Sequence, residues 1–420
     1  MTSRLIDLAA RLEALARSRR IQAVVLLILV AYGVNHVRRG MGDFKVYRQA
    51  ASRAVAGESM YRLNDPHRYL YAPVVTFLFF PLALLPVLAG KILWFAANVW
   101  MRVSIFRSTA VLILPGGRAP PGLHLLVLAL SLRFLDNNIG HGQINIFLLW
   151  LVLEAYVLAG RGLFTLAGLA LAAAIATKIF PGILMLQLVL RRQWRFAFAT
   201  IAGFALLMAV PLLWWGGSYP QLLRDWVAVV ADQAGHYELG NKINQSISAF
   251  VYRLFRPYPG GVPLVELPPA VVVAMTLAIH AAFLAPLVRL SLRLGAAPQP
   301  QGPGGDELAL YLLYSTVLSP YSWKYYFVNL VFPLAAAVRR LWMDHRRSFE
   351  MGLWAVFFLN LLPGLELVGK RLATVLQFGS FHFLAVVVLF ALLAREAFRN
   401  LRRGTVTRGR PAFTDSGAVC

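Results

Sequence analysis

The sequence has very little cysteine and few acidic residues. Cys420 is the only cysteine and stands at the last position, which excludes an internal disulfide, a cysteine metal cluster and an internal thiol nucleophile. Asp and Glu number 18 against 41 Lys and Arg, a net charge of +23. Only 14% of the residues are charged and 59% are hydrophobic, more than a soluble domain of 420 residues can bury. The composition indicates a polytopic membrane protein.

The positive charge has two interpretations, nucleic-acid binding and membrane topology. The arginines gather in short loops, such as Arg191–Arg195, and near both ends of the chain. This distribution is typical of cytoplasmic loops that face anionic lipid. We therefore expect membrane lipid, and not nucleic acid, as a partner.

Apolar runs long enough to cross a bilayer recur along the chain, and we count about ten to thirteen. They predict an all-α bundle of transmembrane helices, a single membrane domain over residues 21–394. Leucines at helical spacing among arginines predict an amphipathic segment at residues 1–20, and a basic tail follows at residues 395–420. The positive-inside rule places both terminal segments in the cytoplasm.

The stretch from Gly42 to Pro73 is a polar, aromatic-rich island between apolar runs. From Asp43 onward, apolar and polar residues separate onto two helical faces, and Gly57 ends the pattern. This predicts an interfacial helix in the first outer loop. Asp43 can act there as a general base, or it can simply cap the helix, and the two roles are compatible.

Polar residues also interrupt the later apolar runs. A charge such as that of Lys178 costs roughly 2.5 to 3.5 kcal/mol inside a membrane segment, so it either faces a cavity, where it could bind a lipid phosphate, or snorkels to the interface. Breaks between apolar runs are tolerated where the backbone lines protein or water. Other polar or aromatic residues at such places are Gln143, Asn145, Asn244, Gln245, Arg253, Trp323 and Lys324. The histidines show no metal-ligand spacing.

Taken together, these motifs resemble those of the polyprenol-phosphate-sugar-dependent glycosyltransferases of family 87, which have the GT-C membrane fold. The first motif of the family, Asp-Phe-x-x-Tyr followed by Gly-x-x-x-Tyr and Tyr-x-Pro, is matched by Asp43, Phe44, Tyr47, Gly57, Tyr61, Tyr71 and Pro73. The later steps are met by Gly142, Gln143 and Asn145, by Lys178 and Pro181, by Asn244, Gln245 and Ser246, and by Ser319, Pro320 and Trp323. Mannosyltransferase relatives carry histidine after the last step, where this chain has Lys324, Tyr325 and Tyr326, so the sugar is left open.

The resemblance implies an inverting transfer of a sugar, a hexose such as mannose, from a polyprenyl-phosphate donor to a glycolipid or glycan acceptor on the outer face of a bacterial inner membrane. It implies Asp43 as the general base. We expect no cofactor, and the chemistry allows a divalent metal but does not require one. We expect donor contacts from Lys178, Lys324, Gln143, Asn145, Asn244, Gln245 and Arg253. We expect an acceptor or cavity wall made by Tyr47, Tyr61, Tyr71 and Trp323.

Two alternatives belong to other classes of protein. A transporter or flippase for a lipid-linked or small anionic solute would use Lys178 and the broken helices as a translocation path. Coupling-ion carboxylates within spans would then be needed, and only Glu154 and Glu366 are candidates. A structural subunit of an envelope complex would explain the hydrophobicity but not the polar motifs.

Overall fold

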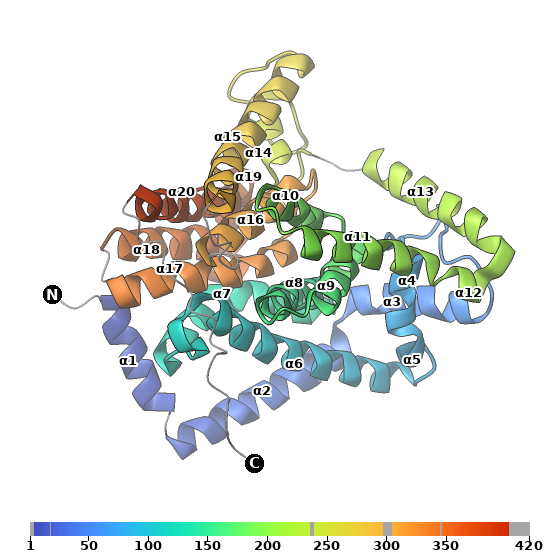
Figure 1. Ribbon diagram of the computed structural model, residues 1–420, viewed down its shortest axis with the longest axis horizontal. Helices are drawn as coiled ribbons and strands as arrows, with labels where there is room; N and C mark the ends of the chain where they lie inside the picture. The colour runs from blue at the N-terminus through green and yellow to red at the C-terminus, as the bar shows by residue number, and fades with distance from the viewer. Residues whose placement is uncertain (1–3, 17, 236–238, 297–304, 345–346, 403–420) are drawn as a thin grey trace.

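The computed structural model describes residues 4–16, 18–235, 239–296, 305–344 and 347–402. In these residues the regular elements are helices, and the only strand-like pairing is an isolated bridge between Tyr258 and Gly261. Figure 1 shows the helices packed as one bundle with α15 (Pro269–Gly295) projecting from it. The expectation of an all-α membrane protein is confirmed.

The chain begins with two helices whose boundary lies close to the predicted one. Helix α1 (Arg4–Ala16) is amphipathic, as expected, and α2 (Arg19–Arg39) follows it. The Leu5 side chain is buried, and the Glu13 carboxylate accepts a hydrogen bond from the Gly122 backbone N–H at the start of α7 (Pro121–His141) over 3.1 Å. The basic segment therefore packs against the bundle.

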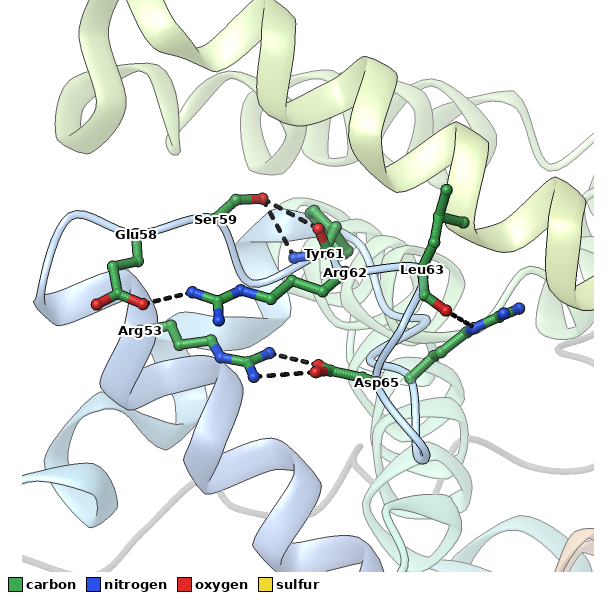
Figure 2. Close-up of polar contacts among 8 residues, drawn as sticks. Arg53, Glu58, Ser59, Tyr61, Arg62, Leu63 and Asp65 are labelled. Carbon is green, nitrogen blue, oxygen red and sulfur yellow. Dashed lines mark hydrogen bonds and ion pairs between the residues drawn. The ribbon is translucent and has the colours of Figure 1, made fainter.

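The predicted interfacial helix is α3 (Gly42–Val55), and Gly57, with φ of 75°, lies just after its end. Figure 2 shows the loop that follows, where Arg53 of α3 pairs with Asp65 through both guanidinium Nη atoms. The loop is also tied to α13 (Tyr219–Gly235), because Ser59 Oγ donates to Asp225 over 3.3 Å.

Several predicted apolar runs are bent helices. The segment with α4 (Pro73–Thr76), η1 (Phe77–Phe79) and α5 (Phe80–Ala83) meets α6 (Val87–Ile113) at 119°. Helix α7 meets α8 (Asn145–Gly160) at 119°, and α18 (Arg347–Leu361) meets α19 (Leu365–Phe378) at 84°. In the described residues, 3 helical segments are long and apolar enough to cross a membrane, or up to 6 if each bent pair is one span. The expected ten to thirteen spans exceed this count, because apolar runs are divided into short or bent helices.

The remaining helices complete the bundle. They are α9 (Phe164–Thr177), α10 (Ile183–Leu190), α11 (Trp194–Ala209), α12 (Leu212–Trp215), α14 (Ile247–Phe255), α16 (Gly305–Leu318), α17 (Val331–Asp344) and α20 (Phe381–Arg402), with the 3-10 segments η2 (Pro115–Gly117), η3 (Phe180–Gly182), η4 (Gly216–Ser218) and η5 (Lys324–Leu330). Helix α16 is buried over nearly its whole length and forms the centre of the core. Figure 1 shows α3, α4, α5 and α12 gathered at one end of the molecule.

The predicted start of the basic tail, residue 395, lies within α20, which continues to Arg402. Residues 395–402 are therefore helical, and the division into a membrane domain and a cytoplasmic tail stays a prediction. Residues 297–304 and 403–420 lie outside the described part of the chain.

Candidate active site

Asp43 is the second residue of α3 and does not cap it. The N-cap position is taken by Met41, whose backbone has φ of 65° and whose N–H donates to the Gly140 carbonyl over 2.8 Å. The Asp43 carboxylate Oδ2 instead accepts a hydrogen bond from Gln143 Nε2 over 2.6 Å. The interpretation of Asp43 as an N-cap is therefore wrong, because a tertiary contact at Met41 places the N-cap two residues earlier.

A row of polar side chains leads away from this carboxylate. Gln143 Oε1 lies 3.5 Å from Asn145 Nδ2, and Asn145 Oδ1 accepts a hydrogen bond from Lys178 Nζ over 2.7 Å. Both amide side chains are buried. The structure thus brings together four of the predicted site residues, contributed by α3, the α7–α8 turn and the break after α9.

Two local breaks make this arrangement feasible. Gly142 ends α7 with φ of 68°, a conformation that favours glycine, and a Cβ there would lie 2.9 Å from the Phe44 Cβ. Lys178 follows α9 in extended conformation, with φ of −147°, just before the Pro181 turn. Each break directs a side chain, Gln143 or Lys178, away from its helix and into the row.

The Lys178 ammonium is enclosed by aromatic rings. Its Nζ lies 4.2 Å from the ring centroid of Tyr326 and 5.7 Å from that of Tyr71. Cation–π attraction and the bond to Asn145 stabilise the charge there. Among the described residues it forms no ion pair with a carboxylate. The ammonium is therefore available to interact with an anion of a substrate.

The predicted tyrosine wall adjoins this row. Tyr47 OH donates to Gln143 Oε1 over 3.2 Å and lies 3.0 Å from Tyr71 OH. Tyr61 OH donates to the Tyr71 carbonyl over 2.6 Å. Trp323 stands 5.2 Å from Tyr325, ring centroid to ring centroid, and its buried Nε1 has no hydrogen-bond acceptor in the described chain. An unpaired buried N–H is a group that a bound hydroxyl could satisfy.

The pKa of the Asp43 carboxyl is raised above its ordinary value by burial. The hydrogen bond from Gln143 and the charges of His141 and Lys178 act in the opposite direction. Burial disfavours the charged form, whereas a donated hydrogen bond and nearby cations favour it. A carboxylate with a raised pKa accepts a proton more readily than an ordinary aspartate.

Three predicted donor contacts are engaged elsewhere within the protein. The Asn244 side chain donates to the Pro320 carbonyl over 2.9 Å, and Gln245 Nε2 donates to the Gln377 carbonyl over 2.9 Å. Arg253 donates from Nε to the Phe378 carbonyl over 3.1 Å. Asn244 thus joins the turn before α14 to the break after α16, whereas Gln245 before α14 and Arg253 in its last turn contact the end of α19. Direct donor binding by them stays a prediction.

Lys324 begins η5 in the break between α16 and α17, outside the candidate spans. Its pKa is lowered to about 8, chiefly by burial and also by the neighbouring Arg133 and Lys242, while Glu366 acts in the opposite direction. Lys324 therefore lies among other cations and not in the row that contains Lys178.

Sequence reasoning missed two buried residues of α6, Lys91 and Trp94, whose polar atoms contact the backbone on either side of the site. Lys91 was visible as a lone cation between two apolar runs, a signal of the same kind as Lys178. Within the described residues, no group of three or more His, Cys, Asp or Glu side chains could hold a metal ion.

Comparison with known proteins places the chain in a family. The model of glycosyltransferase family 87 matches residues 69–298, more than half of the chain. The chain belongs to glycosyltransferase family 87. The matched range contains Gln143, Asn145 and Lys178, whereas Asp43 precedes it. Family 87 membership confirms the expectation of an enzyme that transfers a sugar.

Two curated relatives are mannosyltransferases. A polyprenol-phosphate-mannose-dependent alpha-(1-2)-phosphatidylinositol mannoside mannosyltransferase of Mycobacterium tuberculosis is 28% identical over 200 residues, 41% of this chain and 45% of the relative. The match therefore spans less than half the length of that protein. A polyprenol-phosphate-mannose-dependent alpha-(1-2)-phosphatidylinositol pentamannoside mannosyltransferase of Mycolicibacterium smegmatis is 24% identical over 415 residues, 93% of this chain and 92% of the relative.

Proposed function

We propose that this family 87 enzyme moves a sugar, a hexose such as mannose, from a polyprenyl-phosphate donor to a glycolipid or glycan acceptor, with inversion at the anomeric carbon. Asp43 is the general base. The site faces the outside of a bacterial inner membrane if the apolar run that begins at residue 21 crosses the bilayer, since the positive-inside rule places the basic segment before that run in the cytoplasm and α3 follows the run. The donors named for both relatives support the polyprenyl-phosphate assignment.

The observation that carries the proposal is the connection between a carboxylate and a buried ammonium. Asp43 accepts from Gln143, Gln143 lies beside Asn145, and Asn145 accepts from Lys178. Glycosyl transfer from a phosphate removes a proton from the acceptor hydroxyl and leaves negative charge on the phosphate. The proton acceptor at one end of the row suits the first change, and the cation at the other end suits the second. The row therefore offers a group for each side of the reaction.

The reaction follows from these two groups. The Asp43 carboxylate takes the proton of the acceptor hydroxyl as that oxygen attacks the anomeric carbon of the sugar. The bond between the anomeric carbon and the phosphate oxygen breaks, and its electron pair stays on the polyprenyl phosphate. Lys178 stabilises the negative charge that develops on this leaving group.

The other predicted site residues take three roles according to their contacts. Gln143 and Asn145 orient the groups at either end of the row, and Tyr47, Tyr61, Tyr71 and Trp323 form the wall against which the acceptor lies. Asn244, Gln245 and Arg253 support the donor side by fixing the break that carries Trp323 and Lys324. The mechanism assigns no step to a metal ion or cofactor.

The test is a transfer assay with purified protein in lipid vesicles, with a panel of short-chain polyprenyl-phosphate sugars and release of free polyprenyl phosphate as the readout. Wild type is expected to release it from at least one donor, and Asp43→Asn to lose about 10² to 10⁴ in rate. Burial raises the pKa of Asp43 in the folded protein. At pH values above the ordinary pKa of an aspartate, the ionised carboxylate therefore destabilises the folded state relative to the unfolded chain. Asp43→Asn is therefore expected to melt no lower than wild type at neutral pH.

Glu58→Gln is the matched control, since Glu58 is an exposed acid in the loop after α3. It should keep the wild-type rate. Full activity of Asp43→Asn would overturn the general-base assignment. Absence of release from every donor by folded wild type would overturn the proposed function.

A further inference from the structure

Helix α6 carries two buried side chains, Lys91 and Trp94, that the proposed mechanism does not use. They are 5% and 3% exposed and stand three positions apart, on one face of the helix. We infer that Lys91 and Trp94 are positioning residues that hold Asp43 and Gln143 at hydrogen-bond distance from each other. This inference rests on the proposed role of Asp43 as general base.

Lys91 fixes the backbone that leads into Asp43. Its Nζ donates to the Val37 carbonyl over 3.1 Å and to the Gly40 carbonyl over 2.9 Å, at the end of α2. Met41 follows with φ of 65°, a left-handed conformation that a residue other than glycine adopts only when its surroundings impose it. Lys91 therefore anchors the residue immediately before the strained position.

Trp94 fixes the backbone that leads into Gln143. Its indole Nε1 donates to the Gly142 carbonyl over 2.9 Å. Gly142 has φ of 68°, and the next residue, Gln143, donates its backbone N–H to the Asn138 carbonyl over 2.9 Å. The direction of the Gln143 side chain depends on this turn, so the indole bond helps to aim the amide at Asp43.

Packing alone does not account for a lysine at position 91. Its side chain is buried, and burial disfavours a charged group. Two carbonyls at the C-terminal end of α2 offset that cost, since the dipole there favours a positive charge. A methionine would fill similar space without the cost, so the contribution specific to lysine is its two directed hydrogen bonds.

The same face of α6 also contacts the helix that carries the base. A Cβ at Gly90 would lie 3.2 Å from Cζ of Phe44, the residue after Asp43. The Trp94 ring stands 5.1 Å from that of Phe79, which in turn stands 4.8 Å from Tyr47. One rigid helix thus fixes both turns at once, which preserves the geometry of the pair.

The test compares Lys91→Met, Lys91→Arg and Trp94→Phe in the vesicle assay with the donor that wild type uses. Lys91→Met should lower kcat by about tenfold to hundredfold through misplacement of the base, with little change in KM for the donor. Lys91→Arg should restore most of kcat, because a guanidinium can donate to the same two carbonyls. Trp94→Phe should lower kcat and move the acid limb of its pH profile to higher pH, because the Gln143 hydrogen bond, which lowers the pKa of Asp43, is weakened.

Two exposed residues provide matched controls. Lys45 lies on α3 beside Asp43 with its side chain exposed, and Trp100 lies on α6 and is 58% exposed. Lys45→Met and Trp100→Phe should keep both the wild-type kcat and the wild-type pH profile. A loss of kcat in either control would mean that removing any charge or aromatic ring in this region lowers activity, and it would overturn the inference.

The remaining outcomes are also decisive. A folded Lys91→Met with wild-type kcat, or equal losses in Lys91→Met and Lys91→Arg, would overturn the role of the lysine bonds. A Trp94→Phe pH profile identical to that of wild type would overturn the role of the indole hydrogen bond. If Lys91→Met does not fold, Trp94→Phe and Lys91→Arg together test whether Lys91 and Trp94 position Asp43 and Gln143. Asp43→Asn is measured in parallel. If it is inactive while the α6 variants are normal, only the positioning inference fails; if it is fully active, the general-base assignment fails first.

Discussion

Gln143 donates a hydrogen bond from Nε2 to the carboxylate Oδ2 of Asp43 over 2.6 Å, although the two residues are 100 positions apart in the sequence. The orientation of the amide is fixed from its other side, because Gln143 Oε1 accepts from Tyr47 OH. A donated N–H favours the ionised carboxylate, whereas burial disfavours it. The basicity of Asp43 is therefore set by the balance between this bond and its enclosure.

The first prediction concerns the pH dependence of transfer. A general base must be ionised, so kcat should fall as the pH is lowered through the pKa of Asp43. Because burial raises that pKa, the fall should lie at a higher pH than an ordinary aspartate would give. Gln143→Met removes the hydrogen bond that lowers the pKa, so its acid limb should move to still higher pH. The measurement is kcat against pH at saturating donor and acceptor.

Gln49→Met is the control for this comparison, since Gln49 is exposed on the same helix as Asp43. Its profile should coincide with that of wild type. If the acid limb of Gln143→Met stays where it is in wild type, the hydrogen bond does not set the basicity of Asp43.

The second prediction concerns Lys178. Lys178→Met removes the ammonium proposed to neutralise the donor phosphate, while the acceptor wall is left in place. Loss of a hydrogen bond to a charged group costs about 1.5 to 3 kcal/mol, which corresponds to roughly ten- to a hundredfold in affinity. The KM for the donor should rise by that factor, and inhibition by free polyprenyl phosphate should weaken in parallel. The kcat should fall as well, because Lys178 also stabilises the charge that develops on the leaving group. The KM for the acceptor should change much less.

Lys370→Met serves as the control, because Lys370 is exposed on α19. It should bind both substrates as wild type does. Equal rises in the two KM values of Lys178→Met would contradict a phosphate-specific role and would indicate a general disturbance of the site.

The interfacial helix and the break at Lys178 could be predicted because each is a local pattern. Helix α3 follows from the separation of apolar and polar residues along fourteen positions, and the break follows from a charge and a proline in an apolar run. The start of α3 at Gly42 could not be predicted, because it depends on the bond from Met41 to Gly140, far away in the sequence.

Other features depend on packing that no local pattern records. Helix α13 carries many polar residues, and its apolar residues Leu222 and Val229 are buried only when it lies on the rest of the bundle. The 119° bend between α7 and α8 likewise depends on the space beside Gly142. The motifs predicted the residues of the candidate site, but the contact between Asn145 and Lys178 comes from the tertiary fold.

The third prediction concerns Gly142, where both the positive φ and the close packing against Phe44 and Met41 favour glycine. An alanine there would have to adopt φ of 68°, which costs about 1 to 2 kcal/mol, and its Cβ would lie 2.9 Å from the Phe44 Cβ and 3.1 Å from the Met41 Cβ. Phe44 adjoins Asp43, so Gly142→Ala should lower both the melting temperature and kcat. Gly162 has φ of 78°, and a Cβ there would meet open space within 4 Å, so Gly162→Ala should lose stability from the backbone cost alone and keep kcat. Equal melting and equal kcat in the two variants would show that close packing against Phe44 and Met41 plays no part in holding the base.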